Sequence, residues 1–316
     1  MSGSAAPGRL AGRVAVVTGA TSGIGRVLAE RLADLGATTV VVGREDARAD
    51  RAARAIAQAT GNPHVESLGV TDLALRTEAN RVADELLRRF PEIHLLVNNA
   101  GAFFSRRELT AEGIERTFAL NVLSPYILTV RLAERLRASA PARVVQMASE
   151  AHRAHHVDFD DLEGADEYRG FRQYGRSKLE LILLTREFAR RLAGSGVTVN
   201  AVHPGFIRSG FGLNNGGATA FGIRLAAVLF GRSLTHGVDT PLYVATDPSL
   251  AETTGAYFSG RRRVQGSAPS NASEAARRLW EACRERSGGL SLPDPGSDGP
   301  GREPPRIARA EQAAPA

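Results

Sequence analysis

The fold is decided by a stretch near the N-terminus, Arg13–Gly25, which reads RVAVVTGATSGIG. Its first six residues form an apolar run of the kind found in buried strands. The glycines that follow allow a sharp turn and a close approach to a pyrophosphate, whose negative charge is favoured at the N-terminus of a helix. The stretch therefore predicts a nucleotide-binding strand–turn–helix unit, although a glycine-rich turn alone also occurs at other tight strand–helix junctions.

The alternation of strand and helix continues through the first 205 residues. Near-continuous apolar runs, such as Val40–Val42 and Leu95–Val97, indicate strands that are covered on both faces. The expected strands are Arg13–Thr18, Thr38–Gly43, Val65–Gly69, His94–Asn98, Arg143–Ala148 and Val197–His203. Amphipathic helical segments lie between them, for example at Ile24–Leu35, Ala47–Ala59 and Leu73–Phe90. This pattern predicts an α/β fold with a doubly wound parallel sheet, Rossmann-like and in one domain.

The pattern loosens after Gly205. A helix at His236–Ala245, a strand at Ala256–Ser259 and a helix at Ser273–Glu285 are expected there. We place the domain at residues 13–286, after a flexible N-terminus at 1–12. Residues 287–316 contain almost no large apolar side chain, so a disordered tail is expected because it cannot offset its ordering entropy.

Composition narrows the possible functions of this 316-residue chain. The net charge is +6, but the basic residues are scattered and are not interleaved with stacking aromatics, which argues against nucleic-acid binding. The longest apolar run, Ala220–Phe230, contains Arg224 and is too short for a membrane span. The segment Met1–Arg13 lacks the apolar core of a secretion signal. A single cysteine, Cys283, excludes internal disulfides and fits a cytoplasmic protein.

The basic residues contain an unusual signal, because Lys178 is the only lysine among 40 lysines and arginines. It ends the motif Tyr174-Gly175-Arg176-Ser177-Lys178, and residues four apart share one face of a helix. A nearby ammonium favours the phenolate, so we expect a lowered pKa for Tyr174 and a role in proton transfer. The alternative is a surface tyrosine above a salt-bridging lysine.

These motifs together resemble the short-chain dehydrogenase/reductase family. The resemblance covers roughly residues 10 to 285 and rests on the glycine turn, Asn98-Asn99-Ala100-Gly101, Ser149, Tyr174 with Lys178, and Pro204-Gly205. Finer features are similar to the retinol-dehydrogenase-like branch. They are Arg106–Thr110, Ala151-His152, Asp158–Leu162 and Ala276–Glu281.

The resemblance implies catalytic roles for four residues. Tyr174 would transfer the proton, Ser149 would hydrogen-bond the substrate oxygen, and Lys178 would bind the nicotinamide ribose. Asn121 would hold a water through its backbone carbonyl. Pro125, four residues later, has no N–H, so this carbonyl lacks its ordinary helical partner. A merely kinked helix is the alternative.

The expected cofactor is NADP rather than NAD. An NAD-selective site places an acid at the end of the second strand, where this chain has Gly43 and then Arg44, a residue able to grip a 2′-phosphate. A solvated Arg44 is the alternative. The full set of expected cofactor-binding residues is Gly19, Thr21, Ser22, Gly23, Ile24, Gly25, Arg44, Asp72, Leu73, Asn98, Ala100, Gly101, Tyr174, Lys178, Pro204, Gly205, Ile207 and Ser209. No metal is expected, because His152, His155 and His156 are poorly spaced.

The resemblance also implies an alcohol–carbonyl oxidoreductase, with a catalytically silent NADP-binding sensor or scaffold as the alternative. Residues 206–235, rich in glycine and phenylalanine, are expected to form a lid over a lipophilic or aromatic small molecule. Ordinary core or subunit contacts are the alternative for that segment. Surplus apolar residues on the helix Lys178–Leu192 favour a homodimer.

Overall fold

The structure, a computed structural model, describes residues 8–205 and 234–295. In this part of the chain one sheet has the strand order β3-β2-β1-β4-β5-β6-β7-β8, and only the β7–β8 pair is antiparallel. The strands are β1 (Val14–Thr18), β2 (Thr38–Arg44), β3 (Val65–Val70), β4 (Leu95–Asn98), β5 (Ala142–Met147), β6 (Val197–His203), β7 (Tyr257–Ser259) and β8 (Arg262–Val264). The order reverses between β1 and β4, which is where doubly wound sheets bind ligands.

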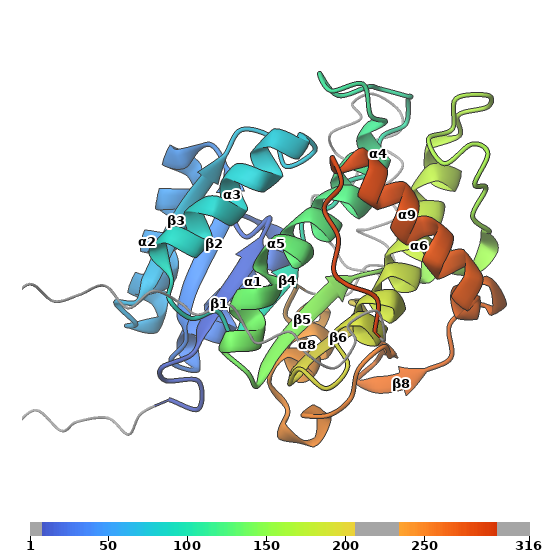
Figure 1. Cartoon of the computed structure of the whole chain (residues 1–316). Coiled ribbons are helices and arrows are strands. Elements are labelled where there is room, and N and C mark those ends of the chain that lie inside the picture. The colour runs from blue at the N-terminus through green and yellow to red at the C-terminus, as the bar shows by residue number, and fades with distance from the viewer. Residues whose placement is uncertain (1–7, 206–233, 296–316) are drawn as a thin grey trace, which may run out of the picture.

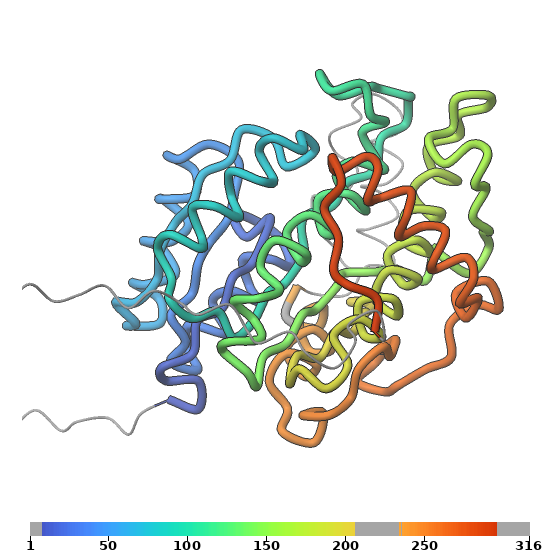
Figure 2. The backbone as a smooth tube through the Cα atoms, in the orientation of Figure 1, coloured from blue at the N-terminus to red at the C-terminus, as the bar shows by residue number. Residues whose placement is uncertain are grey.

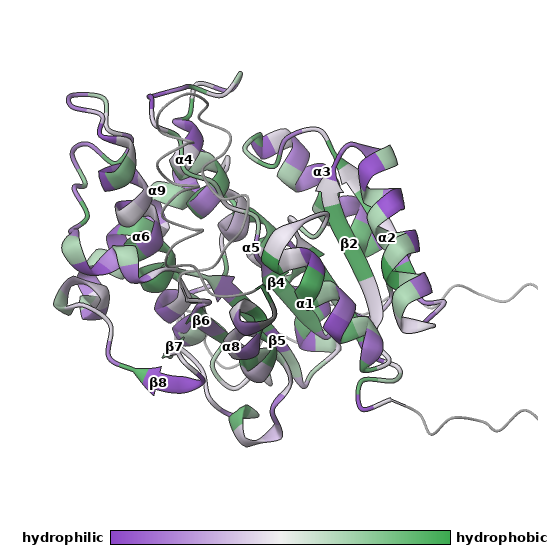
Figure 3. Ribbon diagram, turned by 180° about the vertical axis from the view of Figure 1, so that it is seen from behind, coloured by the Kyte–Doolittle hydropathy of each residue, from purple (hydrophilic) through white to green (hydrophobic). Residues whose placement is uncertain are grey.

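Helices cover both faces of the sheet, as Figure 1 and the reverse view in Figure 3 show. One face carries α1 (Gly23–Asp34), α2 (Asp46–Thr60) and α8 (Leu234–Thr246). The other face carries α3 (Arg76–Arg89), α5 (Ser124–Ala138) and α6 (Gly170–Arg191), with α9 (Ser273–Arg286) packed on α6. Side chains alternate between the two layers, since Val16 joins one core cluster while Ala15 and Val17 join the other.

The predicted doubly wound parallel sheet is confirmed, and the differences from it are local. The helix predicted from Leu73 begins at Arg76, because Asp72 first makes a turn in which its Oδ1 accepts a hydrogen bond from the Ala74 amide at 2.9 Å. The short strand β8 was not expected, because its sequence is basic rather than apolar. No helix in the described segments is long and apolar enough to cross a membrane.

Both ends of the domain extend further than the sequence indicated. The Leu10 amide donates to the Leu35 carbonyl at 2.8 Å, so part of the expected flexible N-terminus is fixed. Residues 287–295, expected as tail, return along α5 and α6 (Figure 2). There the Tyr126 hydroxyl donates to the Leu290 carbonyl at 2.6 Å, and Arg191 donates to the Leu292 carbonyl at 2.7 Å. Residues 1–7 and 296–316 lie outside the described residues.

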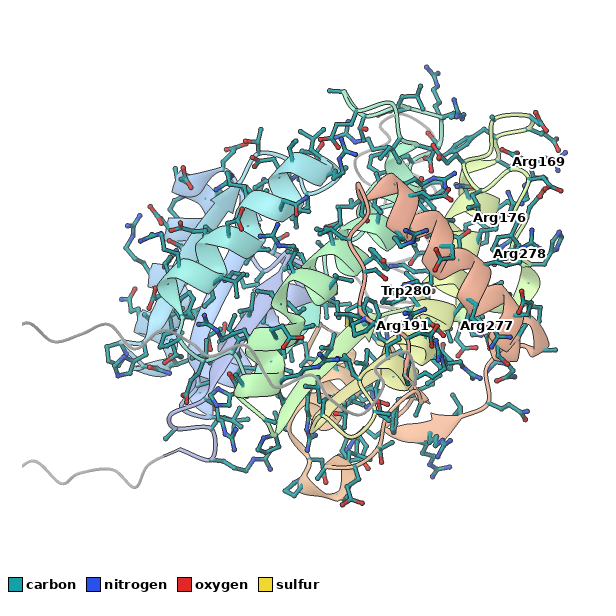
Figure 4. The ribbon with its side chains drawn as sticks, in the orientation of Figure 1. Arg169, Arg176, Arg191, Arg277, Arg278 and Trp280 are labelled. Atoms are coloured by element: carbon teal, nitrogen blue, oxygen red, sulfur yellow. The ribbon has the colours of Figure 1, made fainter. Side chains whose placement is uncertain are left out.

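The second apolar face of α6 is covered by α9. Trp280 is fully buried, with ring centroids 4.8 Å from Tyr126 and 4.9 Å from Phe188. The guanidinium of Arg191 lies 4.3 Å from the Trp280 ring (Figure 4). The surplus apolar residues of α6 therefore have a partner within the chain, and they no longer argue for a second subunit.

The same interface holds a carboxyl group without a hydrogen-bond partner. Glu180 on α6 is fully buried, and neither of its carboxyl oxygens has a partner. Burial raises its pKa to about 8, so this carboxyl is mostly neutral at pH 7. The buried thiol of Cys283 also has a raised pKa, because burial disfavours the thiolate. Its place is in the packed core rather than in the site described next.

Candidate active site

The turn between β1 and α1 is shaped for a phosphate. Ser22 is the N-cap of α1 but makes no side-chain cap, and the first turn contains no acidic residue. The first amides of the helix therefore face no competing carboxylate. Gly19 has φ +64°, and a Cβ at Gly25 would stand 2.3 Å from Asn99 Nδ2, so both positions require glycine. The turn fits the pyrophosphate of a dinucleotide.

Two residues that the sequence analysis did not assign hold this turn in place. Thr18 Oγ1 accepts hydrogen bonds from the amides of Asn99 and Ala100, both at 3.0 Å, and Asn99 Nδ2 donates to the Thr18 carbonyl at 2.8 Å. The predicted Asn98 instead turns its side chain into the core, where Nδ2 donates to Thr129 Oγ1 at 3.1 Å. The doubled asparagine was the available signal, because the two side chains must point to opposite sides of a strand end.

Asn121 lies in a π-helical turn, Ala119–Leu123, directly before α5. Pro125 follows four residues later and cannot donate to the Asn121 carbonyl, in line with the sequence argument. The change from α- to π-type bonding accommodates this missing donor. A water on that carbonyl stays a prediction.

The Asn121 side chain connects three parts of the site. Its Oδ1 accepts from the Ala102 amide at 2.9 Å, and its Nδ2 donates to the Ala102 carbonyl at 2.9 Å. The same Nδ2 donates to Ser177 Oγ at 3.0 Å, and this hydroxyl donates to the Tyr174 carbonyl at 2.7 Å. Ser177 is thus a further residue of the site that the sequence analysis quoted but did not assign. The sequence feature that could have identified Ser177 is its position as a small polar residue between Tyr174 and Lys178.

Tyr174, Lys178 and Ser149 converge beyond the carboxyl ends of β4 and β5. The Lys178 ammonium lies 5.6 Å from the centre of the Tyr174 ring and donates to the Met147 carbonyl at 2.9 Å. The Ser149 side chain hydrogen-bonds Tyr174. A Cβ on Gly101 would stand 3.2 Å from the Lys178 ammonium, so the loop after β4 closes the group. Gly101, Ser149 and the pair of Tyr174 and Lys178, which are far apart in sequence, therefore lie in one cluster.

The expected direction of the Tyr174 pKa is wrong for this cluster. Burial raises the pKa of Tyr174 to about 12, and the hydrogen bond from Ser149 only partly opposes this rise. Burial also lowers the pKa of Lys178 to about 8, because the ammonium loses its hydration. The physical reason is that desolvation of the phenolate outweighs attraction to an ammonium that lies over the ring. At pH 7 the phenol is protonated and can donate its proton.

The family comparison agrees with this arrangement. The sequence model of the short chain dehydrogenase family matches residues 13–215. The chain is 35% identical to human retinol dehydrogenase 13 over 300 residues, which cover 93% of this chain and 90% of that protein. The chain belongs to the short-chain dehydrogenase/reductase family. The predicted resemblance, including its retinol-dehydrogenase-like branch, is confirmed.

Solved structures share the fold. An uncharacterized protein from Mycobacterium Paratuberculosis has a TM-score of 0.72 and 28% identity, with 91% of this chain and 97% of that chain covered. A short chain dehydrogenase from Burkholderia cenocepacia, solved in complex with NADP, has a TM-score of 0.62 and 27% identity, with 84% and 100% covered. The chain described here is therefore, by its family, an alcohol oxidoreductase with a nicotinamide cofactor.

The remaining predicted cofactor-binding residues of this chain differ in their exposure and in their contacts. Arg44 is exposed at the end of β2, with Glu45 and Asp46 turning into α2 as expected. Asp72 already has partners on both carboxylate oxygens, since Oδ2 accepts from Arg116 at 2.7 Å. Thr21 lies against Gly43, and Gly23 is the first residue of α1. Ile24 and Leu73 pack in the two core clusters, and Pro204 and Gly205 follow β6. Ile207, Ser209 and residues 206–233 of the predicted lid at 206–235 lie outside the described residues, and the last two lid positions begin α8 at Leu234.

Aromatic side chains flank Tyr174. The ring of Phe103 lies 6.4 Å from Tyr174, edge-on, and Phe171 lies 6.5 Å from it. Phe171 is 64% exposed. Within residues 8–205 and 234–295, no three histidine, cysteine or acidic side chains are placed to hold a metal ion.

Proposed function

We propose that this chain is an NADP(H)-dependent oxidoreductase that interconverts an alcohol and a carbonyl on a lipophilic or aromatic small molecule. The observation that carries the proposal is the convergence of Ser149, Tyr174 and Lys178 with Asn121 beside a phosphate-shaped turn. A cytoplasmic location is part of the proposal, because one buried cysteine fits a reducing compartment.

Each polar group of the cluster has a defined task in this reaction. The nicotinamide, when bound, supplies or accepts the hydride. Tyr174 donates its proton to the carbonyl oxygen during reduction, and in the reverse oxidation its phenolate form removes the proton from the alcohol. Ser149 hydrogen-bonds the same oxygen. Lys178 donates one N–H to the Met147 carbonyl, and its remaining donors would bind the ribose hydroxyls of the cofactor. The Asn121 carbonyl would hold a water.

Arg44 is expected to read the 2′-phosphate. Arg44 is exposed at the end of β2, where this chain has Gly43 and Arg44 in place of the acidic residue of an NAD-selective site. Arg44→Ala should raise KM for NADPH at least about tenfold, or 1.4 kcal/mol, and barely change KM for NADH. Steady-state kinetics with both cofactors checks this result. Arg51→Ala, an exposed arginine further along α2, is the control and should change neither value. Equal effects of Arg44→Ala on both cofactors would contradict the assignment.

The substrate class is supported by the exposed Phe171 and by Phe103, which flank Tyr174. A panel of carbonyls, followed by NADPH oxidation, should give a kcat/KM at least about tenfold higher for bulky aromatic carbonyls than for small charged ketoacids. Phe171→Ala should reduce this preference, because it removes an apolar wall next to the reacting oxygen. A preference for the ketoacids would overturn the substrate class, and no turnover with any carbonyl would favour a silent NADP-binding protein.

A further inference from the structure

The side chain of His152 links Ser149 to Ser267, which lies more than 100 residues later in the chain. Ser149 is the N-cap of a 3₁₀ turn, Glu150–Ala154, and its Oγ accepts from the Ala151 amide at 3.2 Å. His152 lies in this turn and is fully buried. Its Nδ1 is 2.7 Å from the Ser149 carbonyl, and its Nε2 accepts from the Ser267 amide at 3.1 Å. Ser267 belongs to the segment between β8 and α9.

These two contacts determine the state of the imidazole. Because the Ser267 N–H is a donor, Nε2 must be the unprotonated nitrogen. The proton then sits on Nδ1 and is donated to the Ser149 carbonyl. Burial lowers the pKa of His152, which keeps the ring neutral near pH 7. One tautomer of the ring thus satisfies both neighbours.

The ring itself cannot turn freely. Tyr257 on β7 packs edge-on against it, with ring centroids 5.0 Å apart and an interplanar angle of 78°. The Tyr257 hydroxyl donates to Glu150 Oε1 at 2.8 Å, so the tyrosine is fixed by the residue that follows Ser149. His152 is therefore held on three sides, by Ser149, Ser267 and Tyr257.

We propose that His152 is a positioning residue for Ser149. By holding the Ser149 carbonyl, it fixes the peptide plane from which the Ser149 hydroxyl extends toward Tyr174. It does not touch the substrate oxygen. The proposal rests on the role of Ser149 in the proposed function. A misdirected hydroxyl would weaken the hydrogen bond to the substrate oxygen, and displacements of about 1 Å in such groups cost about 100-fold in rate.

Two amide substitutions separate the contacts of the ring. The amide of asparagine places an N–H near the position of Nδ1, whereas the amide of glutamine reaches the position of Nε2. His152→Gln loses the ring donor to the Ser149 carbonyl and keeps only the backbone N–H of residue 152, which donates to it at 3.2 Å in the wild type. It should lower kcat about 10- to 100-fold while the Kd for NADPH is unchanged. His152→Asn keeps the donor and should stay within about threefold of the wild type. His64→Leu, at an exposed histidine before β3, is the control and should change neither value.

A double-mutant cycle tests whether His152 acts through Ser149. In a Ser149→Ala background, His152→Gln should change kcat by less than about twofold, because residues that act as a unit are not additive. A full effect in that background, or equal losses in His152→Asn and His152→Gln, would overturn the positioning role and leave His152 a structural residue. Wild-type turnover in Ser149→Ala would overturn the role of Ser149 in the proposed function, and the positioning role with it. Loss in Ser149→Ala with wild-type turnover in His152→Gln would overturn the positioning role alone.

Discussion

Tyr174→Phe lowers kcat for carbonyl reduction by an expected 10³-fold, on the order of what loss of a general acid costs. The substitution removes only the hydroxyl, whose pKa of about 12 keeps the transferable proton in place at pH 7. The ring contacts to Phe103 and Phe171 do not need the hydroxyl, so the shape of the site is retained. The Kd for NADPH, measured by fluorescence titration, should therefore stay close to that of the wild type.

A second tyrosine provides the matched control. Tyr168 is also hydrogen-bonded through its hydroxyl, to Thr117 Oγ1 at 3.0 Å and to the Phe104 carbonyl at 3.1 Å, but it is not part of the catalytic cluster. Tyr168→Phe should lower the free energy of unfolding by about 1 kcal/mol, for one partly buried hydrogen-bonding group, and leave kcat nearly unchanged. More than a tenth of wild-type turnover in Tyr174→Phe would refute the proton-transfer role.

Lys178→Arg should lower kcat/KM by more than about 100-fold although it conserves the positive charge. Lys178 is 4% exposed, and its ammonium lies between the Met147 carbonyl, at 2.9 Å, and the backbone of Gly101. A planar guanidinium is larger and carries five N–H donors, so it would displace the loop after β4 and leave donors without partners. The measurement is steady-state kinetics together with NADPH binding.

The arginine-rich composition makes a conservative control available on the same helix. Arg172 lies six residues before Lys178, at a partly exposed position where it forms an ion pair with Glu167. Arg172→Lys changes the same two residue types in the opposite direction and should leave kcat/KM unchanged. If Lys178→Arg behaved like Arg172→Lys, any cation would serve at position 178, and the argument from the single lysine would be lost.

The fold could be predicted because its strands are apolar on both faces and its helices are amphipathic. Runs such as Val40–Val42 are typical of strands buried on both faces of a sheet, and these three residues are fully buried. The basic strand β8 carries no such pattern, since it is an edge strand that exists only by pairing with β7. The packing of residues 287–295 against α5 and α6 could not be predicted from the sequence either. It depends on hydrogen bonds that the side chains of Tyr126 and Arg191 donate to main-chain carbonyls of this segment.

The proximity of Tyr174 and Lys178 could be predicted from the sequence, whereas the electrostatics of the cluster could not. Helical spacing placed Tyr174 and Lys178 on one face, and the structure has them 5.6 Å apart, ring to ammonium. The direction of the Tyr174 pKa was missed because burial acts on the phenolate from all sides, and no local sequence pattern measures burial. Asn99 and Ser177 were missed because their partners, Thr18 and Asn121, are distant in sequence.

The packing of Trp280 has a spectroscopic consequence. Trp280 is the only tryptophan of the chain, and it lies between Arg191, Tyr126 and Phe188 where α9 meets α5 and α6. Indole emission depends on the polarity and the quenchers around the ring, so the intrinsic fluorescence of this protein reports the docking of its C-terminal helix and little else. Circular dichroism, in contrast, averages over every helix. The two signals together separate loss of the C-terminal layer from unfolding of the sheet, without any introduced label.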